Sequence, residues 1–362
     1  MTERIAPVAV DAMGGDHAPG AIVQGAINAA RKGLGVVLVG PEARVREELV
    51  RHRAGHQLPI EVHDAPEVIE MDDHPGQAMR RKKRNSIRAA FELVQSGRAC
   101  AMVSAGNSGA VMAGAILVLG RPAGVERPAI ITALPALKGA PIMLDMGAVV
   151  DAKPIHLVQF ALMGEVWARR VGGVARPRVA ILSNGEEDSK GTELTRTAAA
   201  ALRRSAIGFA GYCEGRDLLT GEFDVIVTDG FTGNVALKTM EGTARVVGEY
   251  LKRALRSSTT AKIGGLLSKT ALEGMKKRLD WREVGGAPLV GVNGVGFITH
   301  GRADAHAVEI AVRRAGDAAR THFTDEIAQA VAPSEALLAA VTDGAGAEPN
   351  PHPVRRSSPA DA

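Results

Sequence analysis

The feature that most constrains the fold is the alternation of short apolar runs with longer helical stretches along almost the whole chain. Most apolar runs are continuous, which is typical of parallel strands buried on both faces. The expected strands are Pro7–Asp11, Val36–Val39, Ile60–His63, Ala101–Ser104, Ala129–Leu134, Ile142–Asp145, Arg178–Ser183, Ile207–Ala210, Asp224–Thr228 and Leu289–Val292. The expected helices are Ala21–Lys32, Glu42–Arg51, Gln77–Gln95, Ser108–Leu119, Pro154–Val171, Leu194–Arg203, Thr232–Ala254 and Asp304–Arg320. The pattern predicts a mainly parallel sheet with helices on both faces, a three-layer α/β/α arrangement.

The length of the chain permits one large core or two fused lobes, since 46% of its 362 residues are hydrophobic. We expect a single catalytic α/β/α domain over residues 1–335. The segment Ser257–Trp281 interrupts the strand–helix rhythm and is predicted to form a helical hairpin or arm. Residues 343–362 are rich in Pro, Ala, Gly and Ser, and this composition predicts a disordered tail.

The predicted arm combines a basic and an apolar face. Lys262, Lys269 and Lys276 recur every seven residues and would share one side of a helix. Such a segment suits an interfacial amphipathic helix, and it suits a dimer arm with an apolar packing face equally well. The positions expected to contact a membrane or an acyl chain are Ile263, Leu266 and Leu267.

Composition excludes several classes of protein. Aromatic residues make up only 3% of the chain, which argues against the stacking platforms of single-stranded nucleic-acid binders. Two cysteines cannot form a disulfide framework and fit a reducing compartment. The first residues lack a signal-peptide pattern, and no apolar run is long enough to span a bilayer. We therefore expect a cytoplasmic protein that does not bind nucleic acid.

Glycine-rich loops follow several of the expected strands. In open α/β sheets ligands bind beyond the carboxyl ends of the strands, where glycines let backbone N–H groups point at an anion. Each loop alone is also explained as a tight turn with a helix cap, but four or five at equivalent positions would converge on one cleft. A late loop of this kind spans residues 291–296. The candidate substrate- or phosphate-binding residues are Asp11, Gly14, Gly15, Gly106, Asn107, Ser108, Gly185, Glu186, Gly230, Thr232 and Gly233.

Titratable side chains in these loops are the candidate catalytic groups. Asp16 and His17 suit proton transfer, although both also suit turn hydrogen bonds. Lys190 follows an acidic cluster and suits binding of phosphate or of a developing oxyanion. Its loop is explained equally by a solvated acidic turn at a helix N-terminus.

Motifs for common cofactors are absent from the sequence. Neither G-x-G-x-x-G nor G-x-x-x-x-G-K-[ST] occurs, and neither H-E-x-x-H nor C-x-x-C occurs. We expect no cofactor and no metal ion.

A dense basic run offers a landing site for an anionic partner. It consists of Arg80, Arg81, Lys82, Lys83 and Arg84. A solvated helix face is the plain alternative, but five adjacent like charges repel one another and favour an anionic partner.

Seven segments together resemble the phosphate acyltransferase family of bacterial phospholipid synthesis, which uses acyl-acyl carrier protein as donor. They read VDAMGGDHAPG, RKKRNSI, VSAGNSGA, HLVQFALMG, NGEEDSKGTEL, EGRDLLTGEFDVIVTDGFTGNVALK and GGAPLVGV. The resemblance covers roughly residues 7–330. It implies a Rossmann-like fold related to phosphotransacetylases and isopropylmalate dehydrogenases, a homodimer, and peripheral membrane association. It also implies that acyl carrier protein and inorganic phosphate are the partners, with acyl phosphate as product for glycerol-3-phosphate acylation by a downstream membrane acyltransferase.

The chain departs from the family pattern at a few positions. Asn85 stands where a serine is expected, Ser108 replaces threonine, and Val149 replaces the asparagine expected after the Gly-Ala pair. No catalytic role is therefore placed at position 149.

The resemblance suggests a direct attack of a phosphate oxygen on the thioester. Under this hypothesis Lys190 and the glycine loops bind phosphate, and Asn107, Asp229 and Asn234 orient them. The basic run receives the carrier protein. Three other readings stay open: a short-chain phosphate acyltransferase using coenzyme A, a metal-dependent dehydrogenase of the isopropylmalate type, and a membrane-surface scaffold without activity.

Overall fold

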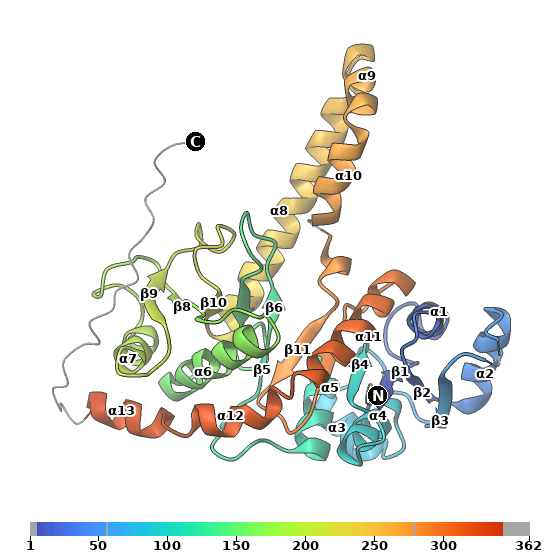
Figure 1. Cartoon of the computed structure of the whole chain (residues 1–362), viewed down its shortest axis with the longest axis horizontal. Helices are drawn as coiled ribbons and strands as arrows, with labels where there is room; N and C mark the ends of the chain where they lie inside the picture. The colour runs from blue at the N-terminus through green and yellow to red at the C-terminus, as the bar shows by residue number, and fades with distance from the viewer. Residues whose placement is uncertain (1–5, 56, 279, 343–362) are drawn as a thin grey trace.

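The computed structural model describes residues 6–55, 57–278 and 280–342, and its strands form two sheets that lie side by side (Figure 1). In spatial order the first sheet contains β3 (Ile60–Asp64), β2 (Val36–Gly40), β1 (Val8–Asp11), β4 (Ala101–Ser104), β12 (Gly296–Ile298), β11 (Ala287–Val290) and β5 (Ala129–Ile130). The second contains β6 (Thr132–Ala133), β7 (Ile142–Leu144), β10 (Val225–Val227), β8 (Val179–Leu182) and β9 (Phe209–Cys213). Most neighbouring strands are parallel; β11 is antiparallel to β12 and β5, and β6 to β7. The expected mainly parallel α/β fold is confirmed.

Helices cover both sheets, and each sheet together with its helices is called a lobe. Those of the first lobe are α1 (Gly20–Arg31), α2 (Glu42–Arg51), α3 (Pro75–Arg81), α4 (Ser86–Gln95), α5 (Ser108–Gly114), the π-helix η1 (Ala115–Leu119) and α11 (Ala305–Arg320). Those of the second lobe are α6 (Pro154–Arg170), α7 (Glu193–Leu202), α12 (Thr324–Val331) and α13 (Ser334–Thr342). Successive residues of β1 belong to different apolar clusters. Val8 and Val10 pack in one cluster, and Ala9 packs in the other. Both faces of the strand are therefore buried, as its continuous apolar run predicts.

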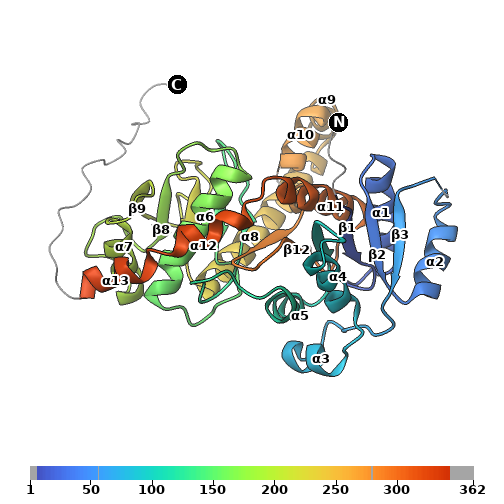
Figure 2. The same cartoon turned by 60° about the horizontal axis from the view of Figure 1, so that its bottom comes forward.

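One apolar core extends from the first sheet to the second. It joins the inner strands of both sheets through α6 and α11. The Trp167 ring on α6 lies edge-on to the Phe323 ring, with 4.8 Å between the ring centroids. It is tilted against the Phe297 ring of β12, with 6.2 Å between the centroids. The C-terminal helices continue this joint, since α12 and α13 run from the first lobe along the second (Figure 2). The two lobes are thus tied together by buried aromatic packing.

The chain passes from one sheet to the other within a few residues. The expected strand Ala129–Leu134 is divided, because Ala129–Ile130 joins the first sheet as β5 and Thr132–Ala133 joins the second as β6. Ile131 between them is 1% exposed and belongs to the shared core. The expectation of one continuous strand was therefore wrong, because both halves of the run find separate partners.

The expected helix Gln77–Gln95 is also wrong in its continuity. It is two helices, α3 and α4, separated by residues 82–85. Asn85 ends the gap by accepting the Arg88 N–H at 2.8 Å, which caps α4. The strand β12 was not expected at all, because its three residues follow a glycine-rich loop closely.

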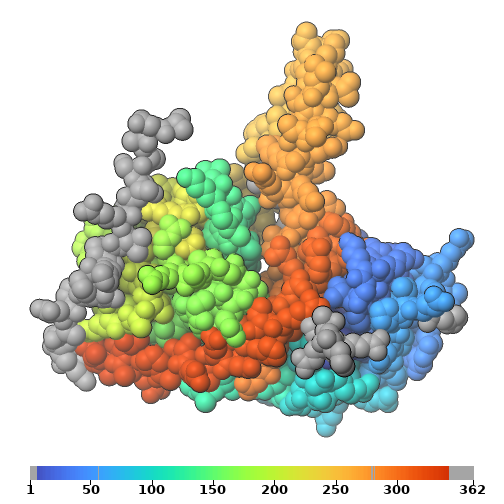
Figure 3. Space-filling model, viewed as in Figure 1, coloured from blue at the N-terminus to red at the C-terminus, as the bar shows by residue number. Residues whose placement is uncertain are grey.

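A helical arm projects from the body (Figure 1). It is formed by the outer part of α8 (Gly230–Arg256), by α9 (Thr259–Leu267) and by α10 (Lys269–Arg278), and a short 3₁₀ turn at Trp281–Glu283 leads back to β11. The space-filling view shows the arm standing clear of both lobes (Figure 3). The expected hairpin is present. The helix is interrupted at Ser268, however, so the seven-residue lysine repeat does not lie on one continuous helix. Within the described residues, no helix is both long and apolar enough to cross a membrane.

Candidate functional site

Two of the predicted glycine loops meet at the carboxyl ends of β1 and β4. The buried Asp11 carboxylate accepts the Ser104 hydroxyl at 2.6 Å and the Met13 N–H at 3.1 Å. A β-carbon built at Gly14 would lie 2.5 Å from the Gly106 nitrogen, so only glycine permits this approach of the two loops. Burial raises the pKa of Asp11, and the hydrogen bonds from Ser104 and Ser86 oppose that shift. Asp11 therefore lies under the loops as their buried anchor.

The outer residues of these loops are open to solvent. Asp16 donates its N–H to the Gly301 carbonyl at 2.7 Å, while its side chain and that of His17 are exposed. Gly15 lies in the first of these loops, and Ser108 begins α5 directly after the second. Asn107 caps α5 by accepting the Ala110 N–H at 3.1 Å, and its amide donates to the Met71 carbonyl at 3.0 Å. The Asn107 side chain is thus engaged in local structure.

His300 was not identified from the sequence and lies beside these loops, two residues after β12. Its Nδ1 accepts the Arg302 N–H at 3.2 Å. Burial lowers the pKa of His300, and the nearby cations Lys238 and Arg302 lower it further. Its position at the carboxyl end of β12 is the signal that would have found it, had that short strand been predicted.

A second cluster lies at the carboxyl ends of β7 and β10 and is centred on Asp145, which was not among the candidates from the sequence. Asp145 is fully buried, and its carboxylate accepts backbone N–H groups from Ile130 at 2.9 Å and Val149 at 2.6 Å. Two weaker bonds come from the N–H groups of Gly147 and Ala148. Burial raises the pKa of Asp145, and these hydrogen bonds oppose the rise. Asp145 therefore organises the loop that follows β7.

The N-terminus of α8 packs directly on that loop. A β-carbon built at Gly233 would overlap the Asp145 carbonyl oxygen, and one built at Gly230 would lie 2.7 Å from the Asp145 Oδ2. The exposed Asn234 has its amide nitrogen 3.1 Å from the β-carbon position of Gly147. Residues 229–234, which read DGFTGN, are thus held in close backbone contact with residues 145–149.

Asp229 and Thr232 form the cap of α8. The Asp229 carboxylate accepts the Thr232 N–H at 2.8 Å and the Thr232 hydroxyl at 2.7 Å. These are the contacts of an ordinary helix cap. In this structure the Asp229 side chain is therefore occupied in holding the helix N-terminus.

The loop after β8 makes most of its contacts within itself. Asn184 accepts the Gly191 N–H at 2.9 Å, and Gly185 is buried against the Lys190 stem. Glu186 contacts Arg216 at 3.3 Å. The Lys190 side chain is exposed and forms no ion pair with a described residue, so its charge is open to an anion.

The late loop 291–296 is not part of either cluster. It precedes β12, and Met102 at the start of β4 donates to the Val295 carbonyl at 2.9 Å. Because β12 and β4 are parallel, this loop lies at the opposite edge of the sheet from the Asp11 loop. The expectation that it joins the same cleft was wrong, since it turns the chain from antiparallel β11 into β12.

The basic run is not one helix face. Arg80 and Arg81 end α3, and the next three residues lie in the gap before α4. Lys82 pairs with Asp73 at 2.5 Å, and Arg84 contacts Asp64 at 3.4 Å. Arg80, Arg81 and Lys83 are exposed and form no ion pair with a described residue. The charge offered to a partner is therefore smaller than the sequence suggests.

A large groove of about 1150 Å³ runs between α8 and the α9–α10 pair and reaches His300 and Arg302 of the first lobe. Its apolar lining comes from Leu251, Leu255, Leu266, Leu272 and Met275. Its basic lining includes the three arm lysines Lys262, Lys269 and Lys276. At the tip, Ile263 and Leu267 are 55% and 83% exposed.

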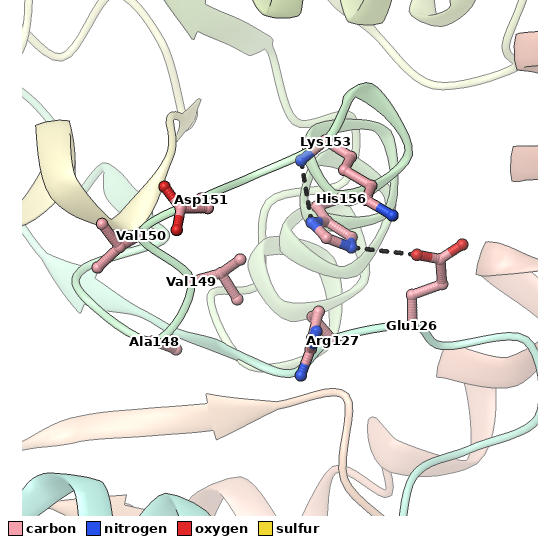
Figure 4. A pocket seen from close by; sticks show the side chains of 8 residues that line it. All are labelled: Glu126, Arg127, Ala148, Val149, Val150, Asp151, Lys153 and His156. Carbon is pink, nitrogen blue, oxygen red and sulfur yellow. Dashed lines mark hydrogen bonds and ion pairs between the residues drawn. The ribbon is translucent and has the colours of Figure 1, made fainter.

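A smaller cavity of about 390 Å³ lies beside the Asp145 loop (Figure 4). It is bounded by Glu126 and Arg127, by residues 148–151, and by Lys153 and His156 at the start of α6. Val149 connects it to the second cluster, because its carbonyl accepts the Gly230 N–H at 2.8 Å. Neither Arg127 nor His156 was selected from the sequence.

The chain is similar to known proteins over almost its whole length. The family model described as "Fatty acid synthesis protein" matches residues 6–326. The phosphate acyltransferase of Anaeromyxobacter sp. (strain K) is 82% identical over 359 residues, covering 99% of each chain. That of Trichlorobacter lovleyi is 51% identical over 323 residues, covering 89% of this chain and 93% of its own.

Solved structures share the fold at low sequence identity. A phosphotransacetylase from Streptococcus pyogenes has a TM-score of 0.58 at 16% identity, covering 86% of this chain and 94% of its own. A branched-chain phosphotransacylase from Enterococcus faecalis V583 has a TM-score of 0.54 at 14% identity, covering 88% of this chain and 100% of its own. Together with the glycine-loop clusters and the near-complete coverage by close relatives, the family match identifies the chain as a member of the phosphate acyltransferase family of fatty acid and phospholipid synthesis.

Proposed function

We propose that the protein transfers a long acyl chain from acyl carrier protein to inorganic phosphate. A phosphate oxygen attacks the thioester carbonyl, the C–S bond breaks, and acyl phosphate and the carrier's thiol are released. Thiolate is a good leaving group, so no covalent intermediate with the enzyme is needed. The acyl phosphate would then feed glycerol-3-phosphate acylation by a membrane acyltransferase.

The single observation that carries the long-chain donor is the groove between α8 and the α9–α10 pair. A volume of about 1150 Å³ exceeds the usual range for small-ligand pockets, and its lining combines leucines with lysines. Apolar side chains suit an acyl chain, and the basic rim suits an anionic carrier or headgroup. The groove ends at His300 and Arg302, beside the Asp16 loop.

The residue roles follow from the loop clusters. The positive end of the α8 dipole and the open charge of Lys190 would attract phosphate and the developing oxyanion. Asp229 and Asn234 would hold that helix start in position. Asp16 or His17 would transfer a proton, because their side chains are exposed beside the first cluster.

The partners follow from exposed charge and apolar surface. Arg80, Arg81 and Lys83 would receive the acidic carrier protein. The exposed Val247 and Tyr250 of α8 would pack against a second copy of the chain, giving a homodimer. We place the protein in the cytoplasm, where Ile263 and Leu267 at the tip would enter the membrane surface and associate the protein with it peripherally.

The test is turnover of the purified protein with palmitoyl-acyl carrier protein and phosphate, following released thiol and acyl phosphate. Phosphate-dependent thiol release without added metal or nucleotide is the expected result. Turnover with acetyl- or butyryl-coenzyme A alone would instead assign the chain to a short-chain acyltransferase. A Leu255→Glu, Leu272→Glu double variant should raise the KM for palmitoyl donor far more than that for a butyryl donor.

A further inference from the structure

The cavity of about 390 Å³ beside α6 holds charged groups that the proposed roles above do not use (Figure 4). It brings together residues that are 22 or more positions apart in sequence, such as Glu126 and Ala148. Its size lies at the lower end of the range found for small-ligand sites. A small ligand therefore fits it better than a chain or a cofactor.

The inner wall of the cavity is a buried histidine with both ring nitrogens engaged. The His156 side chain is 5% exposed. Its Nδ1 accepts the Lys153 N–H at 3.0 Å, so Nε2 carries the proton and donates to the Glu126 carboxylate at 3.1 Å. Burial lowers the pKa of His156, which keeps the ring neutral near pH 7. This wall is a fixed support for the groups around it.

Two cations, Arg127 and Lys153, line the cavity together with two carboxylates. Neither Arg127 nor Lys153 forms an ion pair with a described residue, yet both lie close enough to His156 to lower its pKa. The start of α6 adds a partial positive charge at the same place. Of the two carboxylates, Glu126 accepts a hydrogen bond from His156, and the Asp151 side chain points away from His156 (Figure 4).

We propose that this cavity binds a phosphate-class oxyanion, with Arg127 and Lys153 as its ligands and His156 as a positioning residue. Naming phosphate rests on the proposed function, in which phosphate must bind near the start of α8. The cavity meets that requirement, because Val149 lines it and accepts the Gly230 N–H of α8. Free inorganic phosphate and the phosphodiester of the carrier's pantetheine arm share this chemistry.

The direct test is calorimetric titration of the full chain with inorganic phosphate and, separately, with pantetheine 4′-phosphate. Arg127→Gln and Lys153→Gln should each weaken binding of the true ligand about 10- to 100-fold, because each removes a charge-assisted hydrogen bond. Arg176→Gln and Lys138→Gln remove exposed charges outside the cavity and should leave binding unchanged. The ligand whose affinity responds identifies the source of the phosphate group.

The role of His156 has its own readout. His156→Gln can still accept the Lys153 N–H from the third helical position, whereas His156→Ala cannot. We expect phosphate affinity to be largely kept in the glutamine variant and lost in the alanine variant, with thermal melting of both to show that they fold.

The outcomes separate this site from the proposed reaction. Wild-type protein that binds phosphate through Arg127 and Lys153 but releases no thiol would support the site and refute the reaction. Turnover with an unchanged KM for phosphate and for carrier-linked donor in Arg127→Gln and Lys153→Gln would overturn the site alone. Absence of measurable binding of both ligands to the wild type would also overturn it.

Discussion

Gly233→Ala tests whether the start of α8 is held against the Asp145 loop. The backbone of Gly233 is not in the left-handed region, so alanine is conformationally acceptable there. Its β-carbon, however, would overlap the Asp145 carbonyl oxygen and lie 3.1 Å from both the carbonyl carbon and the Thr228 methyl group. The carbonyl is backbone and cannot rotate away, so the helix start or the loop must shift.

The magnitude follows from three contributions. Overpacking a tight contact costs about 1–3 kcal/mol. A shift of residue 145 also weakens at least one of the backbone hydrogen bonds to its carboxylate, at about 1 kcal/mol. Replacing glycine by alanine inside a helix returns about 1 kcal/mol. We therefore expect a net loss of about 1–3 kcal/mol in the free energy of unfolding.

Gly242→Ala is the matched control. Gly242 lies on the same helix, and a β-carbon there would have no heavy atom within 4 Å. This variant should gain about 0.5–1 kcal/mol from helix propensity alone. The two variants should therefore differ in the free energy of unfolding by about 1.5–4 kcal/mol, although the chemical change is the same.

Urea unfolding followed by circular dichroism measures the difference, and phosphate-dependent thiol release measures its effect on activity. A displacement of about 1 Å at the helix start should reduce turnover of Gly233→Ala about 100-fold. Equal stability of the Gly233→Ala and Gly242→Ala variants would refute the close packing of α8 on the Asp145 loop.

Three further predictions concern packing, pH and the arm. Trp167→Ala should lower the free energy of unfolding by about 3–5 kcal/mol, because it removes the edge-on contact with Phe323 between the lobes; a loss below about 1 kcal/mol in urea titration would contradict this packing. Stability should fall as the pH drops below about 6.5, because the unfolded chain protonates His156 there whereas burial lowers the pKa of the folded chain's histidine. His156→Gln should flatten that part of the pH profile, and an unchanged slope would exclude this histidine as its source. Leu267→Glu at the arm tip should reduce sedimentation with anionic vesicles without changing the melting temperature, since the side chain is 83% exposed; Val50→Glu, on an exposed apolar residue of α2, should not, and equal sedimentation of both variants would argue against tip insertion.

Much of the fold could be predicted because parallel strands leave a strong local pattern. The run ending at Asp11 and the glycines after it predict a buried strand and a loop at its carboxyl end, and the structure has both. The sequence assigned Asn107 and Asp229 to the site, and the structure shows that each accepts a backbone N–H three residues away as a helix cap. Structure of this kind can be predicted because it depends on residues that are close together in the chain.

Contacts between distant segments could not be predicted in the same way. Asp145 reads as the end of an ordinary strand, and only the folded chain shows four backbone N–H groups converging on it. His300 carries no motif, and although His156 begins the segment HLVQFALMG, its contact with Glu126 joins positions 30 residues apart. The basic run reads as five free charges, yet Lys82 and Arg84 find acidic partners that lie well before them in the chain.

The sequence by itself determined the α/β class, the order of most elements, the glycine loops, the helical arm and the family resemblance. Each of these depends on residue type and short-range spacing, which the backbone periodicities translate directly into structure. The tertiary structure alone decided that the strands divide into two sheets at Ile131, that the loop 291–296 lies away from the others, and that a cavity forms at Arg127 and Lys153. These features depend on which surfaces, far apart in the chain, pack against each other. The sequence shows no periodic pattern that would identify such pairs of surfaces.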